Sequence, residues 1–156
     1  MSQICYILCG IPGSGKSTFA KENLPNAVLI SRDICRVELG FTTSVDDKFV
    51  GNREQESQVT ALETQKIKEA IESGKDIVLD NINGGPYLQK TVDTVKSFNP
   101  DIKIFGCNIM TPLEVCIERR KGQIHENIMR NIHSRFSYIS RDNKLFDNVA
   151  DFSGEI

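Results

Sequence analysis

A glycine-rich octapeptide near the start of the chain carries the clearest chemical signal in the sequence. Residues 10–17, GIPGSGKS, fit the pattern GxxxxGK[ST], with three glycines, a lysine and a hydroxyl at the required offsets. Such a loop curls so that successive backbone N–H groups point inward and bind phosphate oxygens. The lysine then reaches the β- and γ-phosphates of a nucleotide, and the hydroxyl holds Mg²⁺. The pattern therefore predicts a P-loop that binds ATP together with Mg²⁺.

The expected ATP-binding residues follow from this match. Lys16 is assigned to the phosphates and Ser17 to Mg²⁺, and the helix that begins at the loop adds its partial positive charge. The glycines are expected to allow the backbone to curl around the phosphates. The full expected set is Gly10, Gly13, Ser14, Gly15, Lys16, Ser17 and Thr18.

A second candidate site follows the next apolar segment. Asp33 comes just after the predicted strand at 27–30, on the side of the sheet where the P-loop must also lie. A carboxylate there can accept the proton of an attacking hydroxyl, so Asp33 is the predicted general base. Arg36 lies one helical turn further on and suits a substrate that itself carries a phosphate. A helix cap is the alternative for Asp33, and a surface ion pair is the alternative for Arg36.

Polar residues at two further element ends complete the predicted site. Asp80 follows the third apolar segment, where a carboxylate organises Mg²⁺ or orients the substrate, and Asn83 adds a hydrogen bond to the substrate. A plain turn is the alternative for both. Arg119 and Arg120 precede a predicted helix break at Gly122, where a mobile basic segment would close over the transferring phosphates. A solvated charged turn is the alternative for these two arginines.

The elements that must position these residues alternate between strand and helix. Strands are predicted at 3–9, 27–30, 76–80 and 102–109, with a short last strand within 146–152. Helices are predicted at 15–23, 33–40, 52–73, 88–95 and 111–120, and residues 41–51 are predicted to form a loop. This alternation predicts an α/β fold of the P-loop NTPase class, with a parallel sheet of five strands and helices on both faces.

The region after the fourth strand is predicted to form a small helical lid over residues 112–140. Thr111–Glu114 has the pattern of a capping box, with a proline at the first helical position. Beyond Gly122, apolar residues recur at spacings of four, four, four and three, which predicts packing in the core or in the lid. These residues are Ile124, Ile128, Ile132, Phe136 and Ile139.

Length and composition are typical of one globular domain, expected to span residues 1–156. No segment approaches the roughly 18 apolar residues of a membrane span, and the N-terminal apolar run is too short for a signal peptide. The five cysteines lack disulfide or metal-ligand spacing, which favours the reducing cytoplasm. The formal net charge of −2 argues against a protein that coats long nucleic acids, but not against one that handles an end.

Four segments together resemble a known family. GIPGSGKST, SRDICR, LDNIN and ERRKG resemble the small P-loop kinases related to the kinase half of phage polynucleotide kinase, and the likeness covers nearly the whole chain. The spacing of Asp33 and Arg36 after the P-loop is what points to the polynucleotide 5′-hydroxyl kinases. The resemblance implies that Asp33 is the base for the 5′-hydroxyl and that Arg36 binds the neighbouring phosphate. It also implies that Arg119 and Arg120 hold the ATP phosphates. The chain departs from the family in the residues after the third strand and in a shorter lid.

Three functions stay open on the sequence. The first is an ATP-dependent kinase acting on the 5′-hydroxyl end of DNA or RNA, which Asp33 and Arg36 favour. The second is a kinase of a small hydroxyl metabolite, such as a nucleoside, a sugar or an antibiotic. It would share the P-loop, the acid after the second strand and the lid. The third is an ATP-binding regulatory NTPase, against which the basic lid and the separate base argue.

Overall fold

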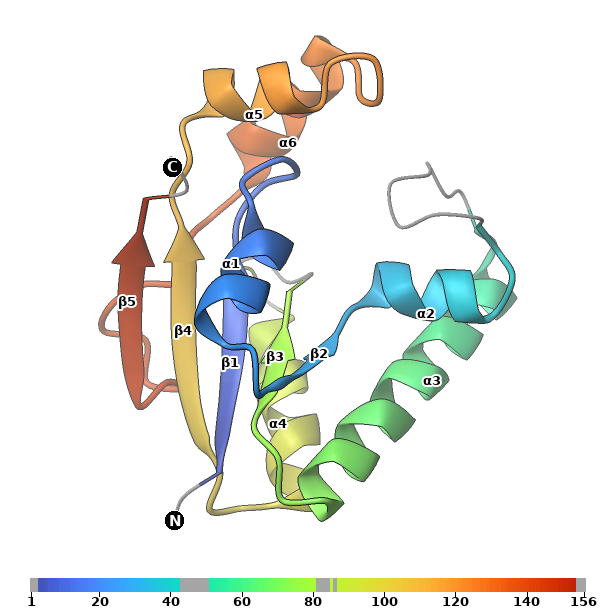
Figure 1. Ribbon diagram of the computed structural model, residues 1–156, viewed down its shortest axis with the longest axis vertical. Helices are drawn as coiled ribbons and strands as arrows, with labels where there is room; N and C mark the ends of the chain where they lie inside the picture. Colours follow the sequence, from blue (N-terminus) through green and yellow to red (C-terminus); the bar gives the residue numbers. More distant parts are fainter. Residues whose placement is uncertain (1–2, 43–50, 81–84, 86, 154–156) are drawn as a thin grey trace.

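A parallel sheet of five strands lies at the centre of the computed structural model (Figure 1), which describes residues 3–42, 51–80, 85 and 87–153. The strands are β1 (Ile4–Cys9), β2 (Val28–Ile30), β3 (Ile77–Leu79), β4 (Lys103–Ile109) and β5 (Asn148–Phe152). Their order across the sheet is β2-β3-β1-β4-β5, and every pairing is parallel. The predicted sheet is therefore confirmed.

Six helices connect and cover the strands in the described part of the chain. They are α1 (Lys16–Asn23), α2 (Arg32–Glu38), α3 (Arg53–Glu72), α4 (Leu88–Phe98), α5 (Leu113–Arg119) and α6 (Glu126–Arg135). Each helix predicted from the sequence is present within a few residues of its expected ends. Most of the loop predicted at 41–51 lies outside the described residues.

Alternate residues of the strands face two different helical layers. Ile7 and Leu79 are buried in the larger core cluster, which also contains Val92 of α4 and residues of α3. Leu8 is buried on the opposite face, in a cluster with Ala20 of α1. Successive side chains of a strand point to opposite faces, so apolar runs buried on both sides indicate helices on both faces. Figure 1 shows α1 in front of the sheet and α4 behind it.

A serine cap positions the start of α2. Ser31 Oγ accepts hydrogen bonds from the backbone N–H groups of Asp33, at 3.1 Å, and Ile34, at 3.3 Å. These bonds satisfy two of the donors that a helix leaves unpaired at its first turn. The helix-cap alternative for Asp33 is therefore wrong, because Ser31 caps the helix and Asp33 lies within its first turn.

Helices α5 and α6 pack on the P-loop through a small apolar cluster of their own. Ile11, which belongs to the P-loop, is buried there together with Cys116 of α5 and Met129 of α6. Leu113 and Ile124 are partly buried against these three residues. The segment predicted to be the lid is therefore attached to the phosphate-binding loop by direct packing.

The predicted packing of the apolar stripe is confirmed at Ile124, Ile132, Phe136 and Ile139, and it is wrong at Ile128. Ile128 is 44% exposed, and its neighbour Met129 is the buried residue of α6. The chain becomes extended at Phe136, where α6 has ended, so the spacing of four no longer keeps the following residues on one helical face. The capping box at Thr111 is also wrong, because α5 begins without any side-chain cap.

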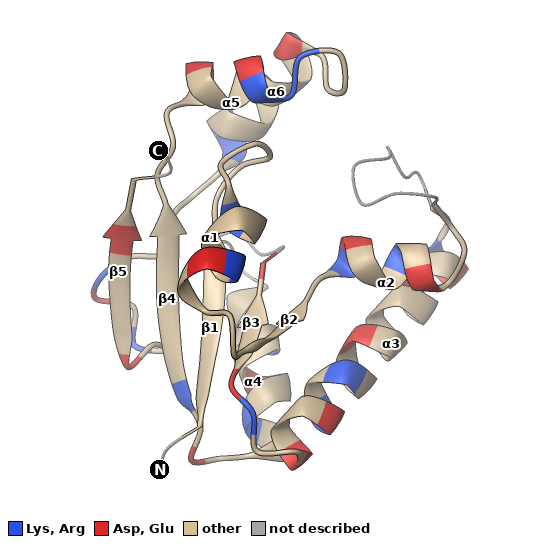
Figure 2. Ribbon diagram, in the orientation of Figure 1, with Lys and Arg blue, Asp and Glu red and all other residues tan. Residues whose placement is uncertain are grey.

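Charged side chains and cysteines are distributed very differently. Figure 2 shows acidic and basic residues intermixed along α2 and α3, and basic residues at the end of α5. All five cysteines are buried, and none of them is part of a disulfide: Cys5, Cys9, Cys35, Cys107 and Cys116. In the described residues, no helix has both the length and the apolar character needed to cross a membrane.

Candidate active site

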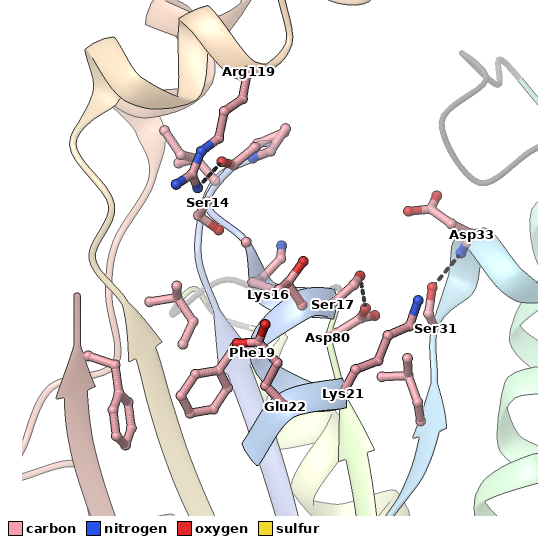
Figure 3. A pocket seen from close by; sticks show the side chains of 18 of the residues that line it. Ser14, Lys16, Ser17, Phe19, Lys21, Glu22, Ser31, Asp33, Asp80 and Arg119 are labelled. Atoms are coloured by element: carbon pink, nitrogen blue, oxygen red, sulfur yellow. Dashed lines mark hydrogen bonds between the residues drawn. The ribbon is translucent and has the colours of Figure 1, made fainter. Parts of the chain in front are cut away.

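A cavity of about 920 Å³ opens where the strands of the sheet end (Figure 3). Parallel sheets bind ligands at this edge, beyond the carboxyl ends of their strands. Figure 3 shows Arg119 on one side of the cavity and Asp33 on the other, with Lys16 and Ser17 between them. The residues that line it include Gly13, Ser14, Gly15, Lys16, Ser17, Thr18, Ser31, Asp33, Asp80, Arg119 and Arg120.

The P-loop takes a backbone conformation that requires glycine. Gly13 has a φ angle of 81°, in the left-handed region that residues with side chains seldom adopt. A Cβ atom there would lie 2.9 Å from the backbone oxygen of Cys116 in α5. The loop is therefore shaped by both its own backbone and the close approach of α5.

The side chain of Lys16 folds back onto the first residue of this loop. Its Nζ atom donates a hydrogen bond to the backbone oxygen of Gly10 at 2.7 Å. Burial lowers the pKa of Lys16, and the attraction of the Asp80 carboxylate opposes that shift. The ammonium group of Lys16 is thus partly removed from water, where its attraction to a phosphate is stronger than on an open surface.

Ser17 and Asp80 form the pair that fits Mg²⁺. The Ser17 hydroxyl donates to Asp80 Oδ2 at 3.1 Å, and Asp80 is only 7% exposed. Hard oxygen ligands of this kind are the ones that Mg²⁺ prefers beside substrate phosphates. The residues present are therefore suited to hold the metal next to the P-loop.

The charge of Asp80 is expected to cost stability at neutral pH. Burial raises the pKa of Asp80, although Lys16 and the hydrogen bond from Ser17 lower it. A carboxyl whose pKa is higher in the folded than in the unfolded state stabilises the fold at low pH. That contribution to the free energy of unfolding is lost as the pH rises through the raised pKa. We expect Asp80→Asn to raise the free energy of unfolding at pH 7 by about 1 kcal/mol. This gain in the free energy of unfolding should shrink as the pH is lowered toward about 4, the ordinary pKa of a carboxyl. Denaturant titration of both proteins at several pH values measures it, and a gain independent of pH would contradict this account.

Ser14 has an unsatisfied hydroxyl inside the same loop. The residue is 1% exposed, and its Oγ atom has no hydrogen-bond partner among the described residues. Buried hydroxyls are usually paired, and an exception calls for an explanation. A bound phosphate would supply the missing partner, which fits the expected ATP site.

The two arginines of the predicted lid reach the cavity by different routes. Arg119 Nη1 donates to the backbone oxygen of Gly13 at 3.1 Å, so its guanidinium lies directly over the P-loop. Arg120 Nη1 donates to Gln123 Oε1 at 2.8 Å. Both side chains line the cavity, and Arg119 donates its hydrogen bond to the phosphate-binding backbone.

Thr111 is a residue of this site that sequence reasoning did not assign. Its Oγ1 atom donates to the backbone oxygen of Ser14 at 2.6 Å, and both residues are buried. The bond joins the segment that leads into α5 to the middle of the P-loop. The apparent capping box concealed this role, because the sequence does not show that Thr111 turns toward a loop 97 residues away.

Thr111→Val is expected to lower the free energy of unfolding by about 1–3 kcal/mol, because it leaves a buried carbonyl without its partner. Denaturant unfolding measures the change. Thr94→Val is the matched control, since Thr94 donates to Lys90 on the exposed face of α4 and should stay within about 0.5 kcal/mol of the original chain. Equal effects of the two variants would mean that the Thr111 bond has no special importance.

Asp33 and Arg36 lie together, but only Asp33 lines the cavity. Arg36 Nη1 donates to Asp33 Oδ1 at 2.9 Å, and Arg36 Nη2 lies 3.2 Å from Glu56 Oε1. Arg36 therefore forms the ion pairs that its alternative expects, and its contact with a substrate phosphate stays a prediction. Asn83 lies outside the described residues. Glu56 was missed, because a single acid in a long polar helix gives no signal of a contact with α2.

The sequence matches one protein family. A family model described as an AAA domain matches residues 6–135. No curated protein sequence matches this chain significantly.

Solved structures share the fold at low sequence identity. A sugar kinase from Janibacter sp. HTCC2649 aligns with a TM-score of 0.63 and 13% identity, over 97% of this chain and 86% of that one. A putative kinase from Chloroflexus aurantiacus aligns with a TM-score of 0.67 and 15% identity, over 97% and 85%. A chain of the Pnkp1/Rnl/Hen1 RNA repair complex aligns with a TM-score of 0.68 and 22% identity, over 88% of this chain and 47% of that one. These similarities confirm the predicted P-loop NTPase fold.

Proposed function

We propose that this chain, which belongs to the AAA domain family, is an ATP-dependent phosphotransferase whose acceptor is a hydroxyl group. The observation that carries the proposal is the set of residues that line one cavity. A phosphate-binding loop with Lys16 forms one part of its wall, and the carboxylate of Asp33 forms another. An NTP-binding switch would need the loop but no carboxylate across from it. The single domain over 1–156, the lid over 112–140 and a place in the cytoplasm belong to the same proposal.

The residues around the P-loop would bind and stabilise the phosphates. Lys16 would attract the β- and γ-phosphates, and the backbone N–H groups of the loop would bind their oxygens. Ser17, with Asp80 beside it, would hold Mg²⁺, which neutralises negative charge on the transferring group when bound. Arg119 and Arg120 would add positive charge from the opposite side, where charge develops during transfer.

Asp33 would act on the acceptor. Its carboxylate would accept the proton of the acceptor hydroxyl while the hydroxyl oxygen forms a bond to the γ-phosphorus. The bond between that phosphorus and the bridging oxygen of ADP breaks, and the electron pair leaves with ADP. Protein groups mainly position and stabilise such a transfer, which agrees with a site built from charges rather than from a nucleophile.

The 5′-hydroxyl end of DNA or RNA is the acceptor that we favour. Arg36 lies beside the proposed base, and its guanidinium suits the phosphate that follows the first nucleoside of a nucleic acid strand. The similar chain from the RNA repair complex agrees with this choice without distinguishing it from the second candidate. Asn83, at the end of β3, stays a proposed substrate-binding residue, and Asp80 would orient the substrate as well as the metal.

A small hydroxyl metabolite is the second candidate, and one observation favours it. The guanidinium of Arg36 already contacts two carboxylates, those of Asp33 and Glu56, so an anionic acceptor must compete with them. An uncharged sugar or nucleoside would meet no such competition. The similar sugar kinase fold agrees with this alternative without distinguishing it.

Transfer of labelled γ-phosphate from ATP tests the proposal. The protein is incubated with Mg²⁺ and either a 5′-hydroxyl oligonucleotide or a panel of nucleosides, sugars and antibiotics. Label on the 5′ end of the oligonucleotide is the expected result. Label only on a small molecule would favour the second candidate. Release of inorganic phosphate with every acceptor unlabelled would favour a regulatory NTPase and contradict the proposed transfer.

A further inference from the structure

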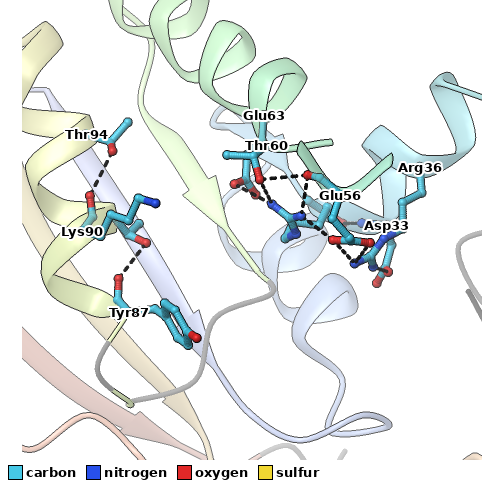
Figure 4. Close-up of polar contacts among 11 residues, drawn as sticks. Asp33, Arg36, Glu56, Thr60, Glu63, Tyr87, Lys90 and Thr94 are labelled. Atoms are coloured by element: carbon cyan, nitrogen blue, oxygen red, sulfur yellow. Dashed lines mark hydrogen bonds and ion pairs between the residues drawn. The ribbon is translucent and has the colours of Figure 1, made fainter. Parts of the chain in front are cut away.

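A carboxylate of α3 lies between two arginines of α2 (Figure 4). Glu56 Oε2 is 2.6 Å from Arg32 Nη2, and Glu56 Oε1 is 3.2 Å from Arg36 Nη2. Arg36 in turn contacts Asp33 through its other terminal nitrogen, Nη1, at 2.9 Å. The three side chains of Glu56, Arg36 and Asp33 therefore form a continuous chain of contacts that ends at the proposed base.

Local structure explains why Glu56 can reach both arginines. Arg32 and Arg36 are four residues apart, so they lie on one face of α2. A capping box between Asn52 and Gln55 fixes the first turn of α3, and Glu56 follows directly. The position of Glu56 is therefore set by the backbone before any ligand binds.

Further contacts with α3 hold Arg32 in place. Arg32 Nη1 donates to Thr60 Oγ1 at 2.9 Å and lies 3.6 Å from Glu63 Oε1. Burial raises the pKa of Glu56, but the hydrogen bonds from Arg32 and Arg36 outweigh it, and the pKa lies below its usual range. Glu56 is thus an ionised partner at neutral pH, held in place by Arg32.

The contacts leave one oxygen of the proposed base open. Asp33 Oδ1 accepts the hydrogen bond from Arg36, whereas Oδ2 has no hydrogen-bond partner within the described ranges. An arginine with a single carboxylate partner tends to bind both of its oxygens in a bidentate pair. Because Glu56 engages Nη2 of Arg36, that nitrogen is drawn away from Asp33.

Stability alone does not account for this cluster. The side chains of Arg32, Arg36 and Glu56 are 23%, 21% and 35% exposed, so each ion pair is screened by solvent. Pairs of this kind contribute about 0–1 kcal/mol. The larger effect of the cluster is on where the guanidinium of Arg36 lies.

We propose that Glu56 is a positioning residue that holds Arg36 so that one oxygen of Asp33 stays open to the acceptor hydroxyl. This inference rests on the proposed function, since it concerns the same base. Glu56 does not line the cavity, and it acts through Arg36. It also determines the orientation in which Arg36 meets a phosphate of the acceptor.

Glu56→Gln tests the proposal, because it keeps the shape of the side chain and removes the charge. We expect kcat for phosphate transfer to fall about 10- to 100-fold, as for residues that orient a reacting group, with an unchanged KM for ATP. Glu56→Asp should recover part of the loss. Lys66→Gln is the matched control, since Lys66 also joins α3 to α2, through Glu38 at 2.8 Å, away from Arg36. It should keep the kcat of the original chain.

A double-mutant cycle separates positioning from a general structural effect. In an Arg36→Gln background, Glu56→Gln should lower kcat no further, because the residue through which it acts is gone. An unchanged kcat for Glu56→Gln alone, an equal loss for Lys66→Gln, or a full additional loss in the Arg36→Gln background would each overturn the inference. Absence of transfer by the original chain to every acceptor would overturn the proposed function and this inference with it.

Discussion

Asp33→Asn is expected to lower kcat for phosphate transfer by about 10²–10⁴-fold while ATP still binds. An amide cannot take up the proton of the acceptor hydroxyl at neutral pH, so the loss falls on the chemical step. The side chain otherwise keeps its size, and its oxygen can still accept the hydrogen bond from Arg36. Asp33 lies across the cavity from the P-loop, which explains why ATP binding should survive (Figure 3).

Two measurements on the same samples check this expectation. Transfer of labelled phosphate gives kcat, and an equilibrium titration with ATP gives the affinity. Glu38→Gln is the control, since Glu38 belongs to the same helix, pairs with Lys66 and does not line the cavity. Full activity of Asp33→Asn would show that another group takes the proton. Loss of ATP binding would show that Asp33 serves the nucleotide instead.

Lys16→Met should lower kcat/KM by about 10²–10³-fold, the effect of removing one preorganised charge from a transition state. The ammonium group lies 2.7 Å from the backbone oxygen of Gly10, at the mouth of the P-loop, and burial strengthens its attraction to phosphate. Methionine has a similar length and no charge. The loss should therefore come from the missing charge rather than from a void in the loop.

Thermal stability with and without ATP and Mg²⁺ checks the binding side of this prediction. A ligand at 100 times its Kd stabilises a protein by about 2.7 kcal/mol, and Lys16→Met should lose most of that gain. Lys68→Met is a control of the same chemistry on the exposed face of α3. If the Lys16 variant were stabilised by ATP as strongly as this control, Lys16 would not contribute to binding of the phosphates.

The sequence predicted those parts of the fold that depend on local patterns. Apolar runs gave the strands, and the P-loop motif gave the turn between β1 and α1, because glycine, lysine and hydroxyl side chains act there within a few residues of one another. Asp33 and Asp80 could be placed at the same edge because the carboxyl ends of parallel strands lie together.

The remaining features depend on contacts between distant residues. Thr111 and Ser14 are far apart in the chain, and no local pattern indicates that the hydroxyl of one meets the carbonyl of the other. Glu56 has neighbours of similar polarity in α3, so its contact with α2 becomes visible only when the two helices are packed. The apolar spacing did not determine that α6 buries Met129 and leaves Ile128 exposed.

The five buried cysteines give the molecule a set of internal reporters. Burial raises the pKa of Cys5 and Cys116, and it raises the pKa of Cys107 to about 11, so these thiols hardly react with an alkylating reagent while the fold is closed. Alkylation of a buried thiol therefore requires local opening of the fold around it. Cys116 lies in the small cluster that joins α5 to the P-loop, and Cys5 lies in the centre of the sheet. The order in which the thiols react, read by mass spectrometry of peptides, would show which unit opens first and whether ATP keeps it closed.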